Sequence, residues 1–135
     1  MRAKRKIVGV GICLVIILGY SFMAIASTAV ATWKYNSYIS MKGQIETVSS
    51  TLLKDEARAY TEYVGNVDTD AKARIYLYDS NGEHLASSNW YSGEHCVYTI
   101  WIKAYSASKG KSLHNLNNRY GDVWSSPKTL TASID

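Results

Sequence analysis

Aromatic side chains are the residues of this chain whose types and spacing best suit a chemical task. The chain contains 4 Trp and 11 Tyr but a single Phe. Phe suits a dry core, whereas Tyr and Trp suit surfaces that are half apolar and half wet. Flat aromatic faces stack against sugar rings, so a row of them on one sheet face would form a glycan-binding surface. On the strands expected below, four aromatic residues share one face: Tyr76, Tyr78, Trp101 and Tyr105.

The same four residues also fit a purely structural role. Aromatic residues on neighbouring strands form cross-strand pairs, and they would fill the core if the two faces were assigned the other way round. This role is the commoner one for aromatic residues in a sheet. Both interpretations remain open at the level of the sequence.

Nucleophilic and metal-binding patterns are weak. His95 precedes Cys96, but adjacent residues of a strand point to opposite faces, so this histidine cannot readily activate the thiol. The combination of His84, His95, Cys96 and His114 has no spacing typical of a metal site. The sequence therefore predicts a protein that is not an enzyme, with no catalytic residue, no metal site and no cofactor.

The segment Asn66-x-Asp68-x-Asp70 is similar to the opening of a calcium-binding loop, in which alternate oxygen ligands converge on one ion. The pattern then fails, because Ala71 stands where the loop needs Gly and Leu77 where it needs Glu. We interpret the segment as a polar turn.

The elements that must position these residues are predicted to be strands. Residues 73–79 alternate, with Ala73, Ile75 and Leu77 on one face and Arg74, Tyr76 and Tyr78 on the other. The following Asn81-Gly82 favours a type I′ hairpin turn. A return strand is expected at 83–90, a second turn at 91–93, and the longest strand at 94–105, with Lys103 on its wetter face.

The remaining segments are less clearly patterned. Residues 33–41 and 44–50 suggest a first hairpin around Gly43, and residues 113–120 and 123–130 suggest two strands joined at Gly121-Asp122. A loop is expected at 106–111, and Pro127 suggests an edge position. Residues 52–64 fit either a helix or, as we favour, a strand over 57–65.

Glycines beyond residue 40 recur at intervals suited to turns between seven or eight short strands. The expected fold is therefore all-β, a single small antiparallel β-sandwich behind an N-terminal hydrophobic signal segment. No motif in the chain is the signature of a known family.

The N-terminus carries that signal. A basic cluster at residues 2–6 precedes 7–33, which contain no charged side chain. Small residues suited to signal peptidase occur at Ala24-Ile25-Ala26 and at Ala29-Val30-Ala31. We predict a signal peptide at 1–26, with an alternative end at 31 or an uncleaved membrane anchor at about 7–29. The β-sandwich domain is expected at 32–135.

The charge balance of the remainder argues against nucleic-acid binding. Four of the 15 Lys+Arg lie in the basic cluster, so 11 remain against 11 Asp+Glu. Cys96 alone remains after the signal segment, so no internal disulfide can form, which is typical of bacterial secreted proteins. We expect a secreted, extracellular protein; the alternative is a single-pass protein of the cell membrane with its C-terminal domain outside.

These observations together predict an exported bacterial protein that acts as a non-catalytic binding or interaction module. Its expected partner is a cell-surface glycan or protein, and it contacts the membrane only through the N-terminal segment. The alternative is a secreted antagonistic toxin, similar to a bacteriocin, that acts on the envelopes of other cells.

Overall fold

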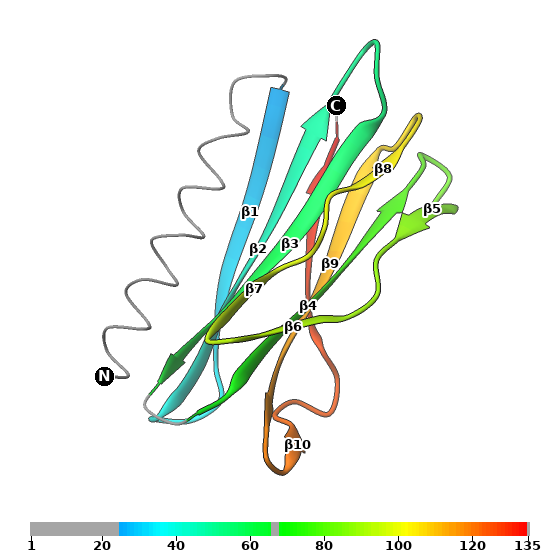
Figure 1. Ribbon diagram of the computed structural model, residues 1–135. Helices are drawn as coiled ribbons and strands as arrows, with labels where there is room; N and C mark the ends of the chain where they lie inside the picture. Colours follow the sequence, from blue (N-terminus) through cyan, green and yellow to red (C-terminus); the bar gives the residue numbers. More distant parts are fainter. Residues whose placement is uncertain (1–24, 66–67, 135) are drawn as a thin grey trace.

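The structure is a computed structural model that describes residues 25–65 and 68–134, and it contains two antiparallel sheets packed face to face (Figure 1). The predicted signal segment falls almost entirely outside the described residues. Within the described ranges, no helix is long and apolar enough to cross a membrane.

The first sheet is a three-stranded meander extended by two short segments. Its strands follow the order β1-β2-β3, and β7 and β8 both pair with the free edge of β3. The bounds are β1 (Ile25–Lys34), β2 (Ile39–Ser49), β3 (Asp55–Gly65), β7 (Cys96–Tyr98) and β8 (Ile102–Ala104).

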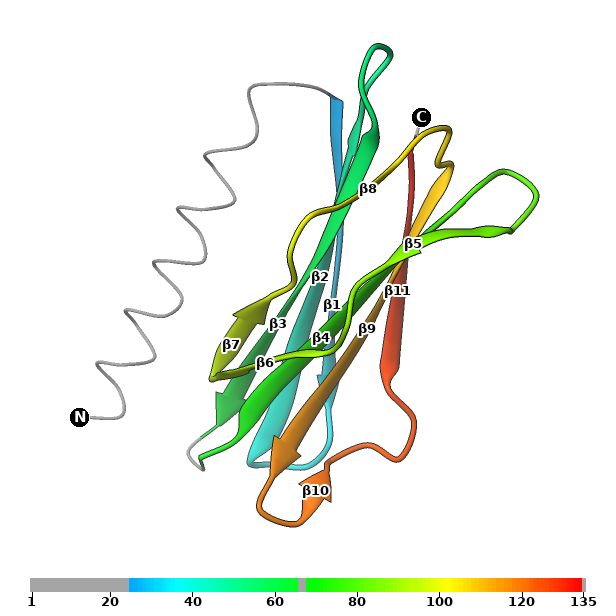
Figure 2. The ribbon, with the colours of Figure 1, turned by 45° about the vertical axis from the view of Figure 1, so that its right-hand side comes forward.

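The second sheet is built around two long central strands, β4 and β9, which pair along their whole length (Figure 2). Two segments, β5 and β6, pair with the other edge of β4, whereas β10 and β11 pair with β9. The bounds are β4 (Asp70–Tyr78), β5 (His84–Ser87), β6 (Tyr91–Glu94), β9 (Lys109–Asn118), β10 (Gly121–Asp122) and β11 (Lys128–Ser133).

The core lies between the two sheets and is formed by alternate residues of the central strands. Ile45 on β2 and Ile75 and Leu77 on β4 are fully buried because every second side chain of a strand points to the same face. The larger cluster consists of Ile45, Ala57, Ala59, Ala73, Ile75, Leu77, Ile102, Ala107, Ala132 and Ile134.

The all-β prediction is confirmed, and the two antiparallel sheets are consistent with a β-sandwich. The strand expected at 57–65 is confirmed as part of β3, and β4 has the two faces assigned from its alternation. The expected number of strands was too low, since the described residues contain eleven strand segments. Two of the extra segments arise because two stretches of chain are each broken into two short strands, β5 with β6 and β7 with β8, and a third is the two-residue β10.

The prediction of a hairpin around Gly43 was wrong. Gly43 lies within β2, and the first hairpin turns at residues 35–38 instead. The side-chain oxygen of Asn36 accepts hydrogen bonds from the backbone N–H groups of Tyr38 and Ile39, both at 2.8 Å. An Asx turn therefore closes this hairpin without a glycine.

The hairpin between β4 and β5 forms where predicted but with another turn type. Only Gly82 has a positive φ there, +83°, whereas a type I′ turn needs positive φ at Asn81 as well. The Gly82 N–H donates to the carbonyl of Asp79, so the loop has three residues. The return strand expected at 83–90 ends at Ser87, and the turn expected at 91–93 is instead strand β6.

The single long strand predicted at 94–105 is also broken. The chain leaves β6 at His95, crosses to the first sheet, and pairs with β3 in two pieces separated by residues 99–101. This break changes which residues face the core. Val97 and Ile102 both pack inward, although residues five positions apart in one regular strand would point to opposite faces.

Near the C-terminus, the reversal occurs at Arg119-Tyr120, not at Gly121-Asp122, which form β10. The loop expected at 106–111 is shorter than predicted, because β9 already begins at Lys109. Pro127 directly precedes β11, which pairs only with β9, so the proline lies beside an edge strand.

Candidate functional site

The four aromatic residues singled out from the sequence do not share one face. Tyr76 and Tyr78 lie next to each other on the outer face of β4 in the second sheet. Trp101 lies between β7 and β8 on the outer face of the first sheet, over Arg58. Tyr105 follows β8 and is 68% exposed, with the Lys54 ammonium 5.2 Å from its ring centroid.

Tyr76 and Tyr78 belong to a group that we call the β4 aromatic cluster, which consists of Tyr76, Tyr78 and His84. The two tyrosine rings are 6.2 Å apart and inclined by 20°. The His84 ring lies edge-on to both, at 5.9 Å from Tyr76 and 6.0 Å from Tyr78. The cluster therefore offers three adjoining rings at the surface, two of them nearly parallel.

Strands β4 and β9 place positively charged side chains around these rings. The guanidinium of Arg74 lies 4.8 Å from the Tyr76 centroid, and the Lys109 ammonium lies 5.5 Å from that of Tyr78. Tyr76 pairs in register with Lys111, so this lysine points to the same face as the ring. The outer face of the second sheet thus combines aromatic rings with positive charge, although the domain as a whole is neutral.

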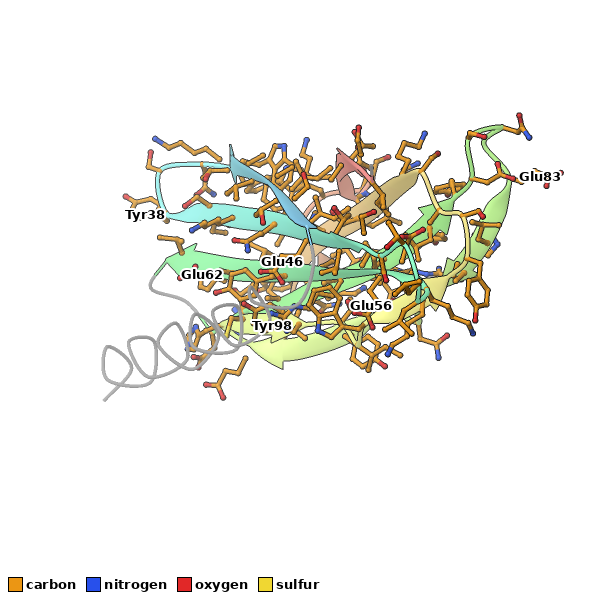
Figure 3. The ribbon with its side chains drawn as sticks, turned by 90° about the horizontal axis from the view of Figure 1, so that it is seen from above. Tyr38, Glu46, Glu56, Glu62, Glu83 and Tyr98 are labelled. Atoms are coloured by element: carbon orange, nitrogen blue, oxygen red, sulfur yellow. The ribbon has the colours of Figure 1, made fainter. Side chains whose placement is uncertain are left out.

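The outer face of the first sheet is organised differently. The guanidinium of Arg58 lies between two rings, 4.2 Å from the Tyr98 centroid and 4.6 Å from the Trp101 centroid. Its Nε donates to the Glu46 carboxylate at 2.5 Å, and these two side chains are only 4% and 8% exposed. Figure 3 shows Glu46, Glu62 and Tyr98 along this face. Because the Arg58 side chain is held by the Glu46 carboxylate and by two rings, we assign the array a structural role.

His114 forms a hydrogen-bond chain that joins the two sheets through the core. Thr61 Oγ1 on β3 donates to the carbonyl of Lys72, so this hydroxyl must accept from His114 Nδ1 at 2.7 Å. His114 Nε2 then accepts from Ser112 Oγ at 2.6 Å. In its neutral form the imidazole therefore carries its proton on Nδ1.

Burial gives this chain of hydrogen bonds a structural role. Removal from water lowers the pKa of His114 to about 3 from its ordinary value of 6.5. A serine hydroxyl bonded to a histidine is the arrangement that activates a nucleophile. However, Thr61, Ser112 and His114 have no exposed surface, so no substrate reaches the hydroxyl.

A second group of side chains lies at the end of the sandwich where β3 ends and β4 begins. Ligand atoms of Asp68, Glu94 and His95 lie within 4.8 Å of one another. Both ring nitrogens of His95 are buried, and no described residue forms a hydrogen bond with them. A surface cleft of about 460 Å³ opens beside the two carboxylates. Its lining consists of Asp68, Thr69, Asp70, Glu94, Asn117, Asn118 and Arg119.

Sequence reasoning missed this cluster, although it noted Asp68 and Asp70. Glu94 and His95 follow much later in the chain and reach Asp68 only because β6 pairs with the start of β4, where Asp70 lies opposite Glu94. Asn66, the first residue of the calcium-like pattern, lies outside the described residues. The acidic pattern was the one signal that pointed to this end of the molecule.

The other two histidines are not members of this cluster. His84 is exposed on β5 near the Asp79–Glu83 turn, and His114 is enclosed between the sheets. Cys96 is half-buried on β7, where it pairs with Glu62 of β3. The described structure therefore does not bring His84, Cys96 and His114 together.

Comparison with known proteins adds no identification: no family model, no curated protein and no solved structure matches the chain.

Proposed function

We propose that this protein is an exported, non-catalytic binding domain that recognises a cell-surface glycan. The observation that carries the proposal is the β4 aromatic cluster, in which Tyr76 and Tyr78 present nearly parallel rings beside His84. Aromatic faces of this kind stack against the apolar faces of sugar rings, and a flat sheet supplies a platform for an extended chain.

The positive charge around the cluster favours glycans that carry acidic groups over neutral glycans. Arg74 and Lys109 stack on the rings, and Lys111 lies on the same face. Carboxylate or phosphate groups on the glycan would pair with these cations, whose interactions are stronger at a partly desolvated surface than in water. Trp101 and Tyr105 lie outside this surface, so the proposed site is reduced to the Tyr76 and Tyr78 half of the original prediction.

Export is supported by the layout of the N-terminal segment, in which a basic cluster precedes an uncharged apolar run. A catalytic role for Ser112 and His114 is disfavoured, because both side chains are enclosed between the sheets.

The proposal is tested by retention of the purified full-length chain on immobilised bacterial cell-wall glycans, with acidic and neutral preparations side by side. We expect retention on the acidic preparation, and a loss of at least about fivefold in Tyr76→Ala and in Tyr78→Ala, taking the about 1–3 kcal/mol that an aromatic side chain contributes to stacking on a nucleic-acid base as a guide for a sugar ring.

Tyr120→Ala is the matched control, because Tyr120, like Tyr76, lies under an arginine, with Arg119 at 4.7 Å from its ring, but it is exposed in the Arg119-Tyr120 turn. Equal losses in all three variants would contradict the assignment of the site. Leakage of liposomes or killing of other cells without glycan retention would favour the toxin alternative.

A further inference from the structure

We propose that Asp68, Glu94 and His95 form a binding site for a divalent transition-metal ion, with Zn²⁺ as the best fit. Their ligand atoms already lie within 4.8 Å of one another, and His95 Nε2 is 3.7 Å from Glu94 Oε1. This site is independent of the glycan surface, which lies at the other end of β4.

The burial of His95 points to a ligand at this position. Its side chain is 9% exposed, and no described residue hydrogen-bonds to either ring nitrogen. A buried polar group left without a partner costs about 1–3 kcal/mol, so such groups are normally paired. Its Nε2 lies 3.7 Å from the Glu94 carboxylate, and a metal ion between them would accept its lone pair.

Thr69 supplies a second, independent indication. This residue is 3% exposed and lines the cleft, yet its hydroxyl has no hydrogen-bond partner among the described residues. A water molecule bound to a metal ion in the cleft would supply that partner. Water at an open coordination position is the usual arrangement where a protein provides only three zinc ligands.

The charge of the cleft favours a cation. Asp68, Asp70 and Glu94 contribute three carboxylates to its walls, whereas Arg119 is the one basic side chain in the lining. Asp68 and Glu94 are exposed, so their side chains can rotate without disturbing the core. The ligand atoms, now within 4.8 Å of one another, need to approach only slightly, because ligands bonded at ~2.1 Å in a tetrahedral site are about 3.4 Å apart.

The donor set selects the class of metal. One imidazole nitrogen with two carboxylate oxygens suits first-row transition metals, whereas Ca²⁺ prefers six to eight oxygen ligands. Zn²⁺ accepts this mixed set in four-coordinate geometry and is therefore the probe of choice.

The test is calorimetric titration of ZnCl₂ into the full-length chain after treatment with a chelator, with CaCl₂ as a parallel titrant. We expect saturable binding of one Zn²⁺ per chain and much weaker Ca²⁺ binding. Glu94→Gln and His95→Asn should each weaken Zn²⁺ binding by at least about tenfold, since even groups that only support a ligand contribute that much.

His95→Asn is chosen because His95 has a φ of +68°, a conformation that Asn tolerates better than most residues. Glu83→Gln, on the exposed tip of the β4–β5 hairpin, is the matched control and should bind Zn²⁺ as the natural chain does. If His95→Asn fails to fold, the Zn²⁺ affinity of Glu94→Gln, on the edge strand β6, still tests the proposed site. No saturable binding below about 1 mM, or unchanged affinity in Glu94→Gln, would overturn the proposal.

Discussion

Among single residues, Gly43 shows most directly how packing overrides local preference. Glycine in a strand interior usually weakens the strand, and here it is retained because two rings approach the backbone closely. A Cβ atom at this position would lie 2.6 Å from Trp33 Cζ3 and 2.9 Å from His114 Cγ. The absent side chain is therefore what lets Trp33 and His114 pack against β2.

Gly43→Ala should lower the free energy of unfolding by about 1–3 kcal/mol, because both rings must move out of a close-packed core. Urea denaturation followed by fluorescence measures the change. Gly82→Asn provides the control, since nothing lies within 4 Å of its Cβ position and Asn tolerates its positive φ. A smaller loss in Gly43→Ala than in Gly82→Asn would contradict the packing argument.

His114 makes stability depend on pH in a defined direction. Its pKa is about 3 in the folded chain and 6.5 when exposed, so the unfolded chain takes up the proton first as the pH falls. Stability is therefore unaffected above pH 6.5 and declines as the pH falls from 6.5 towards 3. The difference of 3.5 pKa units corresponds to a total loss of about 5 kcal/mol.

By pH 5 the expected loss from His114 is about 2 kcal/mol, measured by urea denaturation at pH 7, 6 and 5. His114→Gln should be less stable at pH 7, but its stability should change much less between pH 7 and pH 5. His84→Gln, at an exposed position, should keep the pH dependence of the natural chain. Nitrogen NMR of the imidazole should show a proton on Nδ1 and no titration above pH 4. Titration near pH 6 would contradict the buried, neutral assignment.

Among the elements, the interruption between strands β7 and β8 decides which side chains reach the outer face of the first sheet. Thr99 lies at the break, and its Oγ1 accepts the backbone N–H of Ala59 at 2.9 Å in place of a strand carbonyl. The same hydroxyl donates to the carbonyl of Ile100. Because the break changes the alternation, Tyr98 and Trp101 both reach the outer face and enclose Arg58.

Thr99→Val should cost about 1–3 kcal/mol, because the shape is kept while the buried N–H of Ala59 loses its acceptor. Thermal unfolding monitored by circular dichroism measures the effect. Thr131→Val, on the exposed side of β11, is the matched control and should change stability by less than about 0.5 kcal/mol. Similar effects of the two substitutions would indicate that the hydroxyl does not hold the break.

These elements also show which parts of the fold and of the candidate sites could be predicted from the sequence. The central strand β4 could be predicted because its alternation reflects burial of one face, and so could the adjacent Tyr76 and Tyr78. Trp101 could not be placed, since the break at Thr99 depends on a hydrogen bond from Ala59, forty residues earlier in the chain. The cleft cluster was equally beyond reach, because Asp68 and Glu94 meet only through strand pairing.

For the whole molecule, the start of β1 bears on the two predicted cleavage positions. β1 begins at Ile25, so the first predicted cleavage position, after Ala26, leaves Ser27–Lys34 paired with β2. Cleavage after Ala31 would remove five further residues, whose partners are Gly43–Thr47. The exposed edge of β2 would then be left without most of its neighbouring strand.

We therefore predict that the exported chain begins at Ser27, as intact mass of the secreted product would show. A chain that begins at Thr32 should be less stable by more than about 2 kcal/mol, since several ladder hydrogen bonds at about 0.5–1.5 kcal/mol each are lost. A chain that begins at Ser27 is the control. A stable secreted product that begins at Thr32 would contradict this prediction.

The position of β1 has a mechanical consequence. The start of β1 and the end of β11 lie at one end of the sandwich, and β10 lies at the other (Figures 1 and 2). All 10 residues of β1 are in register with β2. A pull on Ser27 along the strand, against a load at the β10 end, stretches the hydrogen bonds of Ser27–Lys34 together in shear and does not peel them one after another. The domain is thus built to withstand tension that arrives through its first strand.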